Sequence, residues 1–395
     1  MASFAQLMVI VLAGLAGPLL SASKKIMIPV VVGELVAGIA LGKTGAGIIK
    51  ADDPTIAFLG NIGFAMLMLG AGMHVPLRNR GLLGSLKRAS LAVAVSAVLA
   101  AGVGVAIDSV IGLGLPAVWA ILVATGSAAI VLPALQEAGV SPDKALLAMA
   151  WATVADIVTI VAVPLALQPS HAVRAGLGAL AVAGGAVVVW LVATLLSRDD
   201  ALRELRRQSG TRMWALDLRG ALIALFALCA LAQGVGTSIM IAGFAAGLIV
   251  AIQGGPHRLT DQVSGVANGF LVPLFFVVLG ASLNVRALLT NGHELELAGL
   301  LIVGMVLVHV LAARVIRAPL WTGLIVTAQL GVPAAVVKLG LSAGILHAGE
   351  GAAIIFAALV SLGVCATGTA IAKRRLAAAE PPPLPDAAGA PGVAR

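Results

Sequence analysis

The sequence contains little charge and few cysteines. Only 11% of its 395 residues are Asp, Glu, Lys or Arg, whereas 60% are hydrophobic, and the mean hydropathy is +1.09. A soluble domain needs more charge than this to cover its surface, so the chain is expected to lie mostly in a lipid bilayer. The two cysteines, Cys229 and Cys365, both fall inside apolar runs, which favours neither a disulfide framework nor a metal-binding cluster.

Several functional patterns are also missing. No strand-like run is followed by a GxGxxG motif, which argues against a soluble nucleotide-sensing domain. The apolar runs do not alternate strictly with polar residues, which disfavours a membrane β-barrel. The formal net charge of +8 sits in short loops, where it indicates membrane orientation rather than nucleic-acid binding. Neither a nucleophile–base pair nor a metal-ligand cluster is present, so an enzyme is the least favoured class and no cofactor is expected.

The apolar runs predict an all-α polytopic membrane protein with about thirteen transmembrane helices. These helices are expected near residues 4–23, 28–42, 55–73, 89–107, 115–137, 145–168, 175–196, 218–235, 237–252, 266–284, 295–313, 318–346 and 351–372. Lys24 and Lys25 follow the first run instead of preceding it, so we expect a retained helix and not a cleaved signal peptide. The Pro/Ala-rich stretch 374–395 is expected to form a disordered cytoplasmic tail.

The basic residues in the loops predict an orientation. Twenty Lys and Arg residues follow odd-numbered runs or lie in the tail, whereas four follow even-numbered runs. Cytoplasmic loops of membrane proteins carry the excess of Lys and Arg. The N-terminus is therefore expected outside and the C-terminus in the cytoplasm, for a multi-pass protein of the cell inner (plasma) membrane.

Three short stretches recur about 200 residues apart, in the same order. Ala37-Gly38-Ile39 matches Ala246-Gly247-Leu248, residues 69–75 match 279–285, and residues 119–125 match 321–327. Each partner lies seven helices later, and because seven is odd the partners cross the membrane in opposite directions. This predicts an inverted-topology repeat, as in many secondary transporters. We expect a transporter domain over 1–373, with one repeat at about 28–168, linking helices at 175–235 and a second repeat at about 237–372.

Two partner helices of this repeat are interrupted at corresponding places. The helix 115–137 contains Gly126-Ser127 and Pro133, and the helix 318–346 contains Gln329-Leu330-Gly331 and Pro333. Unwound backbone inside a membrane exposes carbonyls and half-helix ends that can bind ions. A glycine that only allows close packing is the alternative for either helix alone. The matched pair favours a transport site, and the helices are expected to cross near Ser127 and Gly331.

Four ionisable residues lie inside predicted spans: Asp156 in the middle of 145–168, Lys338 in 318–346, Glu34 in 28–42 and His309 in 295–313. A charge at the bilayer centre costs roughly 2.5–3.5 kcal/mol or more, so such residues are candidates for function. For Glu34, a structural hydrogen bond remains an equal alternative. For His309, a hydrogen bond to a neighbouring helix is the preferred interpretation. For Lys338, snorkelling along a cavity and a direct role both stay open.

A buried carboxylate provides the chemistry of exchange. Burial favours the protonated, neutral form of a carboxyl group, whereas a bound cation favours its ionised form. A proton and a cation therefore compete for one group. We expect Asp156, with Thr125 and Ser127, to form this ion-binding site, and the transported monovalent cation is the only metal ion expected there. Lys338 is predicted to pair with Asp156, directly or through water, when no ion is bound.

Several stretches resemble the monovalent cation:proton antiporter superfamily, in particular the bacterial cation:proton antiporter-2 type of the sodium/hydrogen exchanger family. They are residues 28–38 (IPVVVGELVAG), 58–63 (FLGNIG), 124–127 (ATGS), 135–140 (LQEAGV) and 273–280 (PLFFVVLG). The resemblance implies two crossed discontinuous helices, a homodimer, and a mobile core domain that moves like an elevator. Asp156 falls where that family keeps its ion-binding aspartate.

The sequence departs from this family at three places. Ala155, and not Asp, Asn or Gln, precedes Asp156; the helix 295–313 carries His309 but no lysine; and the second interruption reads Gln-Leu-Gly-Val, with Lys338 as a candidate for the missing positive charge. The acidic pair of electrogenic members is absent, which favours electroneutral exchange. The preferred function is exchange of Na+ or K+ for H+. A channel-like potassium efflux protein, an organic-anion carrier on the same fold and a sensor without flux remain alternatives.

Overall fold

The computed structural model describes residues 3–22, 30–73, 80–137, 140, 142–167, 172–212, 214–254 and 257–377, and the secondary structure in these ranges is entirely helical. The helices are α1 Phe4–Gly14, α2 Ala16–Ser21, α3 Val30–Leu41, α4 Pro54–Met73, α5 Arg80–Ile111, α6 Pro116–Ala124, α7 Ala128–Glu137, α8 Pro142–Leu167, α9 Ala172–Arg198, α10 Asp200–Arg212, α11 Leu216–Gly234, α12 Ile239–Gln253, α13 His257–Val266, α14 Val272–Ser282, α15 Val285–Thr290, α16 Gly292–Val315, α17 Leu320–Val326, α18 Gly331–Ser342 and α19 Ala348–Ala377. A π-helical turn, η2 (Ala267–Leu271), joins α13 to α14.

The apolar runs of the sequence appear as membrane-length helices. Ten segments within the described residues are long and apolar enough to cross a membrane. Two shorter apolar helices, α3 and α12, and the interrupted pair α6–α7 coincide with the other three expected spans. The predicted all-α membrane-spanning fold is therefore confirmed, while the count of thirteen spans stays a prediction.

The ends of these helices follow local sequence signals. Ser238 precedes α12, and its side chain accepts a hydrogen bond from the amide of Met240 (3.2 Å). Gly254 ends the same helix with φ of 60°, a left-handed conformation that glycine adopts without a steric penalty. Asn291 caps the start of α16 in the same manner as Ser238. Polar and glycine residues at the ends thus define where the apolar segments stop.

Glycines allow close packing between helices of the two expected repeats. A Cβ atom on Gly38 of α3 would overlap the carbonyl oxygen of Val277 in α14. The matching Gly247 of α12 has the same relation to the carbonyl oxygen of Leu69 in α4. Equivalent glycines therefore support equivalent helix contacts, as an inverted repeat would require. The boundaries of the repeats remain a prediction.

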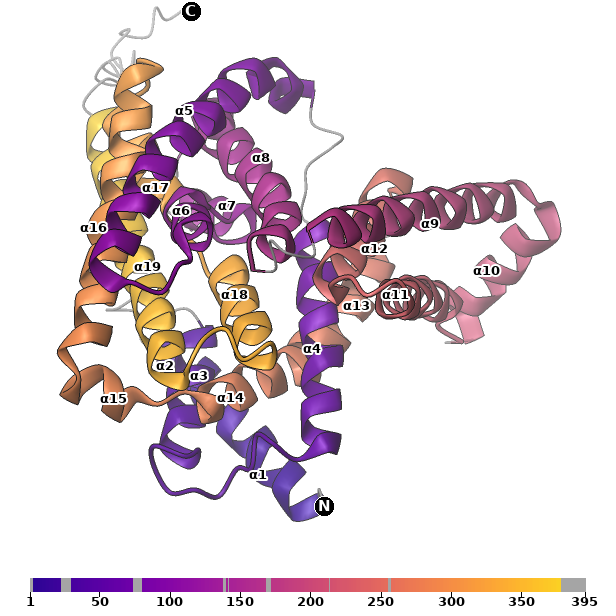
Figure 1. Cartoon of the computed structure of the whole chain (residues 1–395). Coiled ribbons are helices and arrows are strands. Elements are labelled where there is room, and N and C mark those ends of the chain that lie inside the picture. Colours follow the sequence, from indigo (N-terminus) through magenta and orange to yellow (C-terminus); the bar gives the residue numbers. More distant parts are fainter. Residues whose placement is uncertain are drawn as a thin grey trace, which may run out of the picture.

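Figure 1 shows how these helices are arranged. The helices α9, α10 and α11 extend away from the rest of the molecule, and α16 and α19 lie on the opposite side. The short helices α6, α7, α17 and α18 lie in the interior between these parts. The two interrupted pairs are thus positioned where other helices surround them.

Candidate ion-binding site

The first interruption separates α6 from α7. The helix α6 ends at Ala124, Thr125 is extended (φ −76°, ψ 151°), and α7 begins at Ala128. Gly126 lies in this break, and a Cβ atom there would be 2.5 Å from the carbonyl oxygen of Val326. Real Cβ atoms do not approach so closely. Glycine is therefore required because the other interrupted helix passes directly against this position.

The second interruption separates α17 from α18 and contacts the first. The helix α17 ends at Val326, and α18 begins at Gly331. The amide of Ser127 donates a hydrogen bond of 2.7 Å to the carbonyl oxygen of Ala328. Both predicted interruptions are thus present. The sequence had suggested a contact at Gly331. The observed contact falls three residues earlier, at Ala328.

The two prolines expected to extend these interruptions do not do so. Pro133 lies inside α7, so the first break is confined to residues 125–127. Pro333 is the third residue of α18, where a backbone N–H has no partner within the helix. Its missing donor costs nothing there. Pro333 therefore lies in the first turn of the second half-helix and does not break it.

Asp156 lies beside the first interruption. It belongs to α8, its side chain is 8% exposed, and its Oδ2 atom accepts a hydrogen bond of 3.0 Å from the amide of Ala128. Ser127, the residue directly before Ala128, is also buried at this point. The carboxylate therefore sits at the N-terminus of α7, where free amides and the helix dipole stabilise negative charge. A side chain of α8 and the break of α6–α7 form one polar centre.

Threonines frame this centre, and two of them were missed by the sequence analysis. The Thr125 hydroxyl, which was expected here, lies 3.0 Å from the Thr159 hydroxyl, and Thr159 also donates to the carbonyl oxygen of Ala155 (2.7 Å). Thr153 is buried and its hydroxyl has no partner among the described residues. Thr153 and Thr159 lie one helical turn before and after Asp156. Their spacing of three residues from Asp156 was a signal in the sequence that could have identified them.

A cavity of about 280 Å³ reaches both interruptions from one side. Ser127, Leu330 and Gly331 line its inner end. The walls come from α3, α4, α13, α14 and η2, where Ser264 and Asn268 provide polar groups. An ion that enters this cavity meets Ser127, and the backbone amide of the next residue, Ala128, hydrogen-bonds Asp156.

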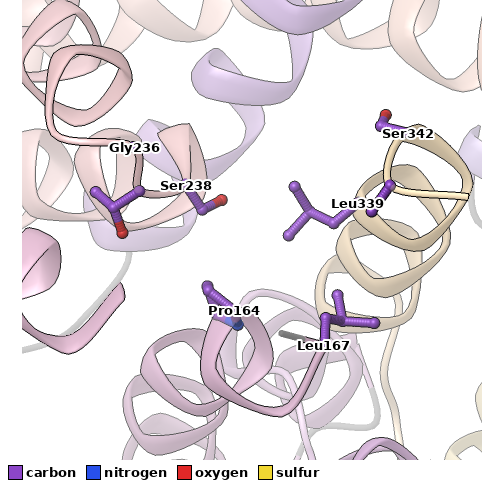
Figure 2. A pocket seen from close by; sticks show the side chains of 8 residues that line it. Pro164, Leu167, Gly236, Ser238, Leu339 and Ser342 are labelled. Atoms are coloured by element: carbon purple, nitrogen blue, oxygen red, sulfur yellow. The ribbon is translucent and has the colours of Figure 1, made fainter. Parts of the chain in front are cut away.

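Two further cavities lie at the other end of α18. One, of about 250 Å³, is lined by Leu339 and Ser342 of α18, Pro164 and Leu167 of α8, and the turn before α12. Figure 2 shows that the labelled side chains of α8, α18 and this turn surround one open space. The other, of about 190 Å³, is lined by Lys338, Ser342 and residues of α14 and the α3–α4 connection. The 280 Å³ cavity therefore meets the start of α18 at the interruption, and these two cavities meet its other end.

Lys338 lies away from Asp156. It lines the 190 Å³ cavity with Asp52 and Ser282, and the ion pairs of the described residues do not include one with Asp156. Seven residues separate Lys338 from Gly331, which places it about 10 Å along the helix axis. The expected direct pairing is therefore absent in this conformation.

Gln329 and His309 belong to a separate polar cluster. The Gln329 side-chain nitrogen lies 3.5 Å from the sulfur of Met305, and the His309 ring nitrogen Nδ1 lies 2.9 Å from the Met305 carbonyl oxygen. Glu34 lies elsewhere. Its side chain is 2% exposed and packs on Gly17 of α2. The structure thus brings together Asp156, Thr125, Gly126 and Ser127, with Gly331 at the end of the same cavity.

Nearly the whole chain is similar to known membrane proteins. Residues 7–372 match the model of the sodium/hydrogen exchanger, transmembrane family. The chain belongs to this family. It is 27% identical, over 73% of its length, to the Na+/H+ antiporter NhaS5 of Synechocystis sp., and 26% identical, over 65% of its length, to the Na+/H+-K+ antiporter GerN of Bacillus cereus.

The sodium/hydrogen exchanger fold is also found in the structural comparison. The sodium proton antiporter MjNhaP1 of Methanocaldococcus jannaschii, solved at pH 8, aligns with a TM-score of 0.63 and 19% sequence identity, covering 94% of this chain and 98% of that one. The chain spans 41% of the length of the Synechocystis relative and 65% of the length of the Bacillus cereus relative. The family and the multi-pass membrane fold expected from the sequence are thus confirmed.

Proposed function

We propose that the chain exchanges a monovalent cation, Na+ or K+, for H+ across the membrane, and that both ions compete for Asp156. The observation that carries this proposal is the position of the carboxylate, whose Oδ2 atom accepts a hydrogen bond from Ala128 at the start of a half-helix. The names of the two relatives, a Na+/H+ and a Na+/H+-K+ antiporter, support the choice of cations.

The surroundings of Asp156 suit such competition. The first amides of α7 and its dipole favour the ionised carboxylate, and a cation that enters the cavity beside Ser127 is attracted by it. A proton on the carboxylate removes that attraction. Because the group is buried, an ionised carboxylate without a cation is costly to move through the protein. The site is therefore expected to cross the membrane when it holds a proton or a cation, but not when it is empty.

The stoichiometry that we propose is one for one. The described residues of the two interruptions and of the 280 Å³ cavity lining include no carboxylate, so Asp156, which contacts the start of α7 from α8, is the carboxylate that serves this site. One carboxylate binds either one proton or one monovalent cation with the same net charge. Exchange at a single carboxylate is therefore electroneutral.

We also propose the assembly and orientation that the family resemblance and the loop charges imply. The protein acts as a homodimer in the inner membrane, with its N-terminus outside and its C-terminus in the cytoplasm. The cavity that reaches Ser127 is lined by Val31, next to the start of α3, and by Met73 at the end of α4. With this orientation it opens to the cytoplasm. An elevator-like movement of the core would open the site to the other side.

The organic-anion alternative lacks support near the interruptions. A carboxylate substrate would need a cation beside the broken helices, but Lys338 lies about 10 Å along the axis from the start of α18. The channel alternative differs from exchange in its coupling, because a channel would move potassium without moving protons.

The decisive experiment measures proton movement in everted membrane vesicles when Na+, K+ or Li+ is added. Wild-type protein is expected to exchange at least one of these cations for H+. Asp156→Asn keeps the shape of the side chain but cannot ionise, so exchange is expected to fall at least roughly a hundredfold, as when an essential ionisable group is removed.

The matched control is Asp199→Asn, which removes a carboxylate from the exposed connection between α9 and α10. It should exchange like wild type. Wild-type exchange rates in the Asp156→Asn variant would refute the proposed role of Asp156. Potassium flux without proton movement would favour the channel.

A further inference from the structure

A second polar cluster lies behind the second interruption. Its members are Trp151 of α8, Met305 and His309 of α16, Gln329 of the break and Ser361 of α19. His309, Trp151 and Ser361 are fully buried, and Gln329 is 4% exposed. None of the five lines the cavities that approach the interruptions. The cluster is therefore not part of the ion pathway itself.

Gln329 is held from two sides. The Ser361 hydroxyl accepts a hydrogen bond from the backbone amide of Gln329 (3.1 Å) and lies 3.3 Å from the backbone carbonyl oxygen of the same residue. The Gln329 side-chain nitrogen lies 3.5 Å from the Met305 sulfur. Neither contact uses the side-chain oxygen of Gln329, which is buried without a partner among the described residues.

His309 presents an unused acceptor in the same region. Its Nδ1 atom lies 2.9 Å from the Met305 carbonyl oxygen. A carbonyl only accepts, so Nδ1 carries the proton of the neutral ring and Nε2 is left as an acceptor. The Nε2 atom is buried without a partner among the described residues, and so is the indole N–H of Trp151. The Trp151 and His309 rings stack with centroids 5.7 Å apart.

These three atoms have complementary hydrogen-bonding roles. Two are acceptors, His309 Nε2 and the Gln329 side-chain oxygen, and one is a donor, the Trp151 indole N–H. A single water molecule donates two hydrogen bonds and accepts one or two, so its capacity matches the needs of two acceptors and one donor. Buried waters in proteins occur at such polar sites with two to four partners. A buried polar group left without any partner would be costly.

The cluster is connected to Asp156 through the interruptions. Gln329 follows Ala328, whose carbonyl oxygen accepts the hydrogen bond of the Ser127 amide. The residue after Ser127, Ala128, in turn donates its backbone amide to the Asp156 carboxylate. A displacement of Gln329 would therefore move Ala328, and with it the amides that hold Asp156.

We propose that His309 is a positioning residue of the transport site, which holds Gln329 and thereby the second interruption through a buried water bound at its Nε2 atom. This inference rests on the proposed function, since its effect is on the cation affinity of Asp156. His309 does not touch the transported ion. A phenylalanine could provide the same stacking on Trp151, so packing alone does not explain the two ring nitrogens.

Three substitutions separate the roles of the ring. His309→Phe keeps an aromatic ring but removes both nitrogens. His309→Asn places an amide near the position of Nδ1, and His309→Gln extends an amide to the position of Nε2. We expect His309→Phe and His309→Asn to raise the half-saturating cation concentration about tenfold, as for a lost buried hydrogen bond. His309→Gln should restore a value close to that of wild type.

The measurement is exchange against cation concentration in everted vesicles, with the thermal unfolding midpoint of each purified variant as a check on folding. An unchanged half-saturating concentration in His309→Phe, or a near-normal value in His309→Asn together with a raised one in His309→Gln, would overturn the inference. If wild type itself exchanges no cation, the proposed function fails instead, and the two failures are distinguished.

A direct observation covers the case in which His309→Phe does not fold. A wild-type structure at a resolution that reveals ordered water is expected to contain a water within hydrogen-bond distance of both His309 Nε2 and the Gln329 side-chain oxygen. A direct contact between the two side chains, or no water between them, would contradict the proposal.

Discussion

Among the described residues, Asp156 is held by a backbone amide beside neutral hydroxyls and not by a charged side chain. Its described hydrogen-bond partner is the Ala128 amide, and the hydroxyl pair of Thr125 in the break and Thr159 in α8 lies nearby. Neutral donors and acceptors of this kind leave the carboxylate free to accept either a proton or a cation. The residues that tune its affinity are therefore expected to be threonines and serines.

Thr159→Val tests this expectation. Valine has nearly the same shape as threonine but cannot hydrogen-bond the Thr125 hydroxyl, which then loses its partner inside the protein. We expect the half-saturating cation concentration to rise roughly tenfold. Thr194→Val is the matched control, because the Thr194 hydroxyl bonds only the Trp190 carbonyl in α9. Equal effects of the two substitutions would contradict a role for Thr159.

Lys338→Met tests where the lysine acts. If Lys338 paired with Asp156, its removal would make the carboxylate easier to protonate, and the pH profile of exchange would move to higher pH. Because Lys338 lines the separate cavity beside Asp52 and Ser282, we expect the profile to stay in place. Exchange rates measured between pH 6 and pH 9 in everted vesicles would reveal a shift of about half a unit or more, and a shift to higher pH would re-establish the pairing.

At the scale of elements, the two interruptions depend on each other. Gly126 passes close to the Val326 carbonyl oxygen, and the Ser127 amide bonds the Ala328 carbonyl oxygen. Neither half-helix could keep its position if the other were displaced. The pair is therefore expected to move as one unit during transport.

Gly126→Ala should separate the two interruptions. The added methyl group overlaps the Val326 carbonyl, and overpacking of this kind costs about 1–3 kcal/mol. We expect exchange to be largely lost and the thermal unfolding midpoint to fall. Gly102→Ala in α5 is the control, since nothing lies within 4 Å of a Cβ atom there. That substitution should leave exchange intact, and a similar loss in both variants would mean that the contact at Gly126 is not the cause.

For the whole molecule, the loop charges predict an orientation that labelling can test. In a background of Cys229→Ser and Cys365→Ala, a cysteine is introduced by Ser3→Cys near the N-terminus or by Arg374→Cys near the end of α19. A membrane-impermeant maleimide should label the first variant in intact cells and the second only after the membrane is opened. The reverse pattern would invert the proposed orientation and turn the cavity beside Ser127 to the outside.

Much of this architecture was predictable because membrane helices are encoded locally. Apolar runs mark the spans, and Gly126 and Gly331 mark the interruptions, since glycine permits a break where other residues favour a continuous helix. Contacts between distant segments were not predictable. The hydrogen bond from Ser127 to Ala328 joins two backbone groups, and the stacking of Trp151 on His309 joins α8 to α16. Neither leaves a pattern in a single sequence.

The lack of a direct Lys338–Asp156 ion pair among the described residues was not predictable for a related reason. The place of Lys338 inside an apolar run gave its approximate depth, and Asp156 was assumed to be near because both residues lie in the middle of long runs. The half-helix α18 begins at the interruption, at Gly331, and ends at Ser342. Lys338 therefore lies nearer to the end of α18 that is farther from the interruption. The location of a break, and not the centre of a run, sets the depth of the residues that follow it.

The single carboxylate at the interruptions has a consequence for the energetics of the cell. If each cycle exchanges one proton for one cation, the membrane potential neither drives nor opposes transport. The pH difference alone then limits the steady-state ratio of cation concentrations across the membrane. This ratio reaches about tenfold for each pH unit, because a tenfold concentration ratio of either ion corresponds to the same free energy. Such a protein could expel Na+ or K+ against its concentration gradient only while the outside is more acidic than the cytoplasm. With equal cation concentrations on both sides, an alkaline medium would reverse its direction.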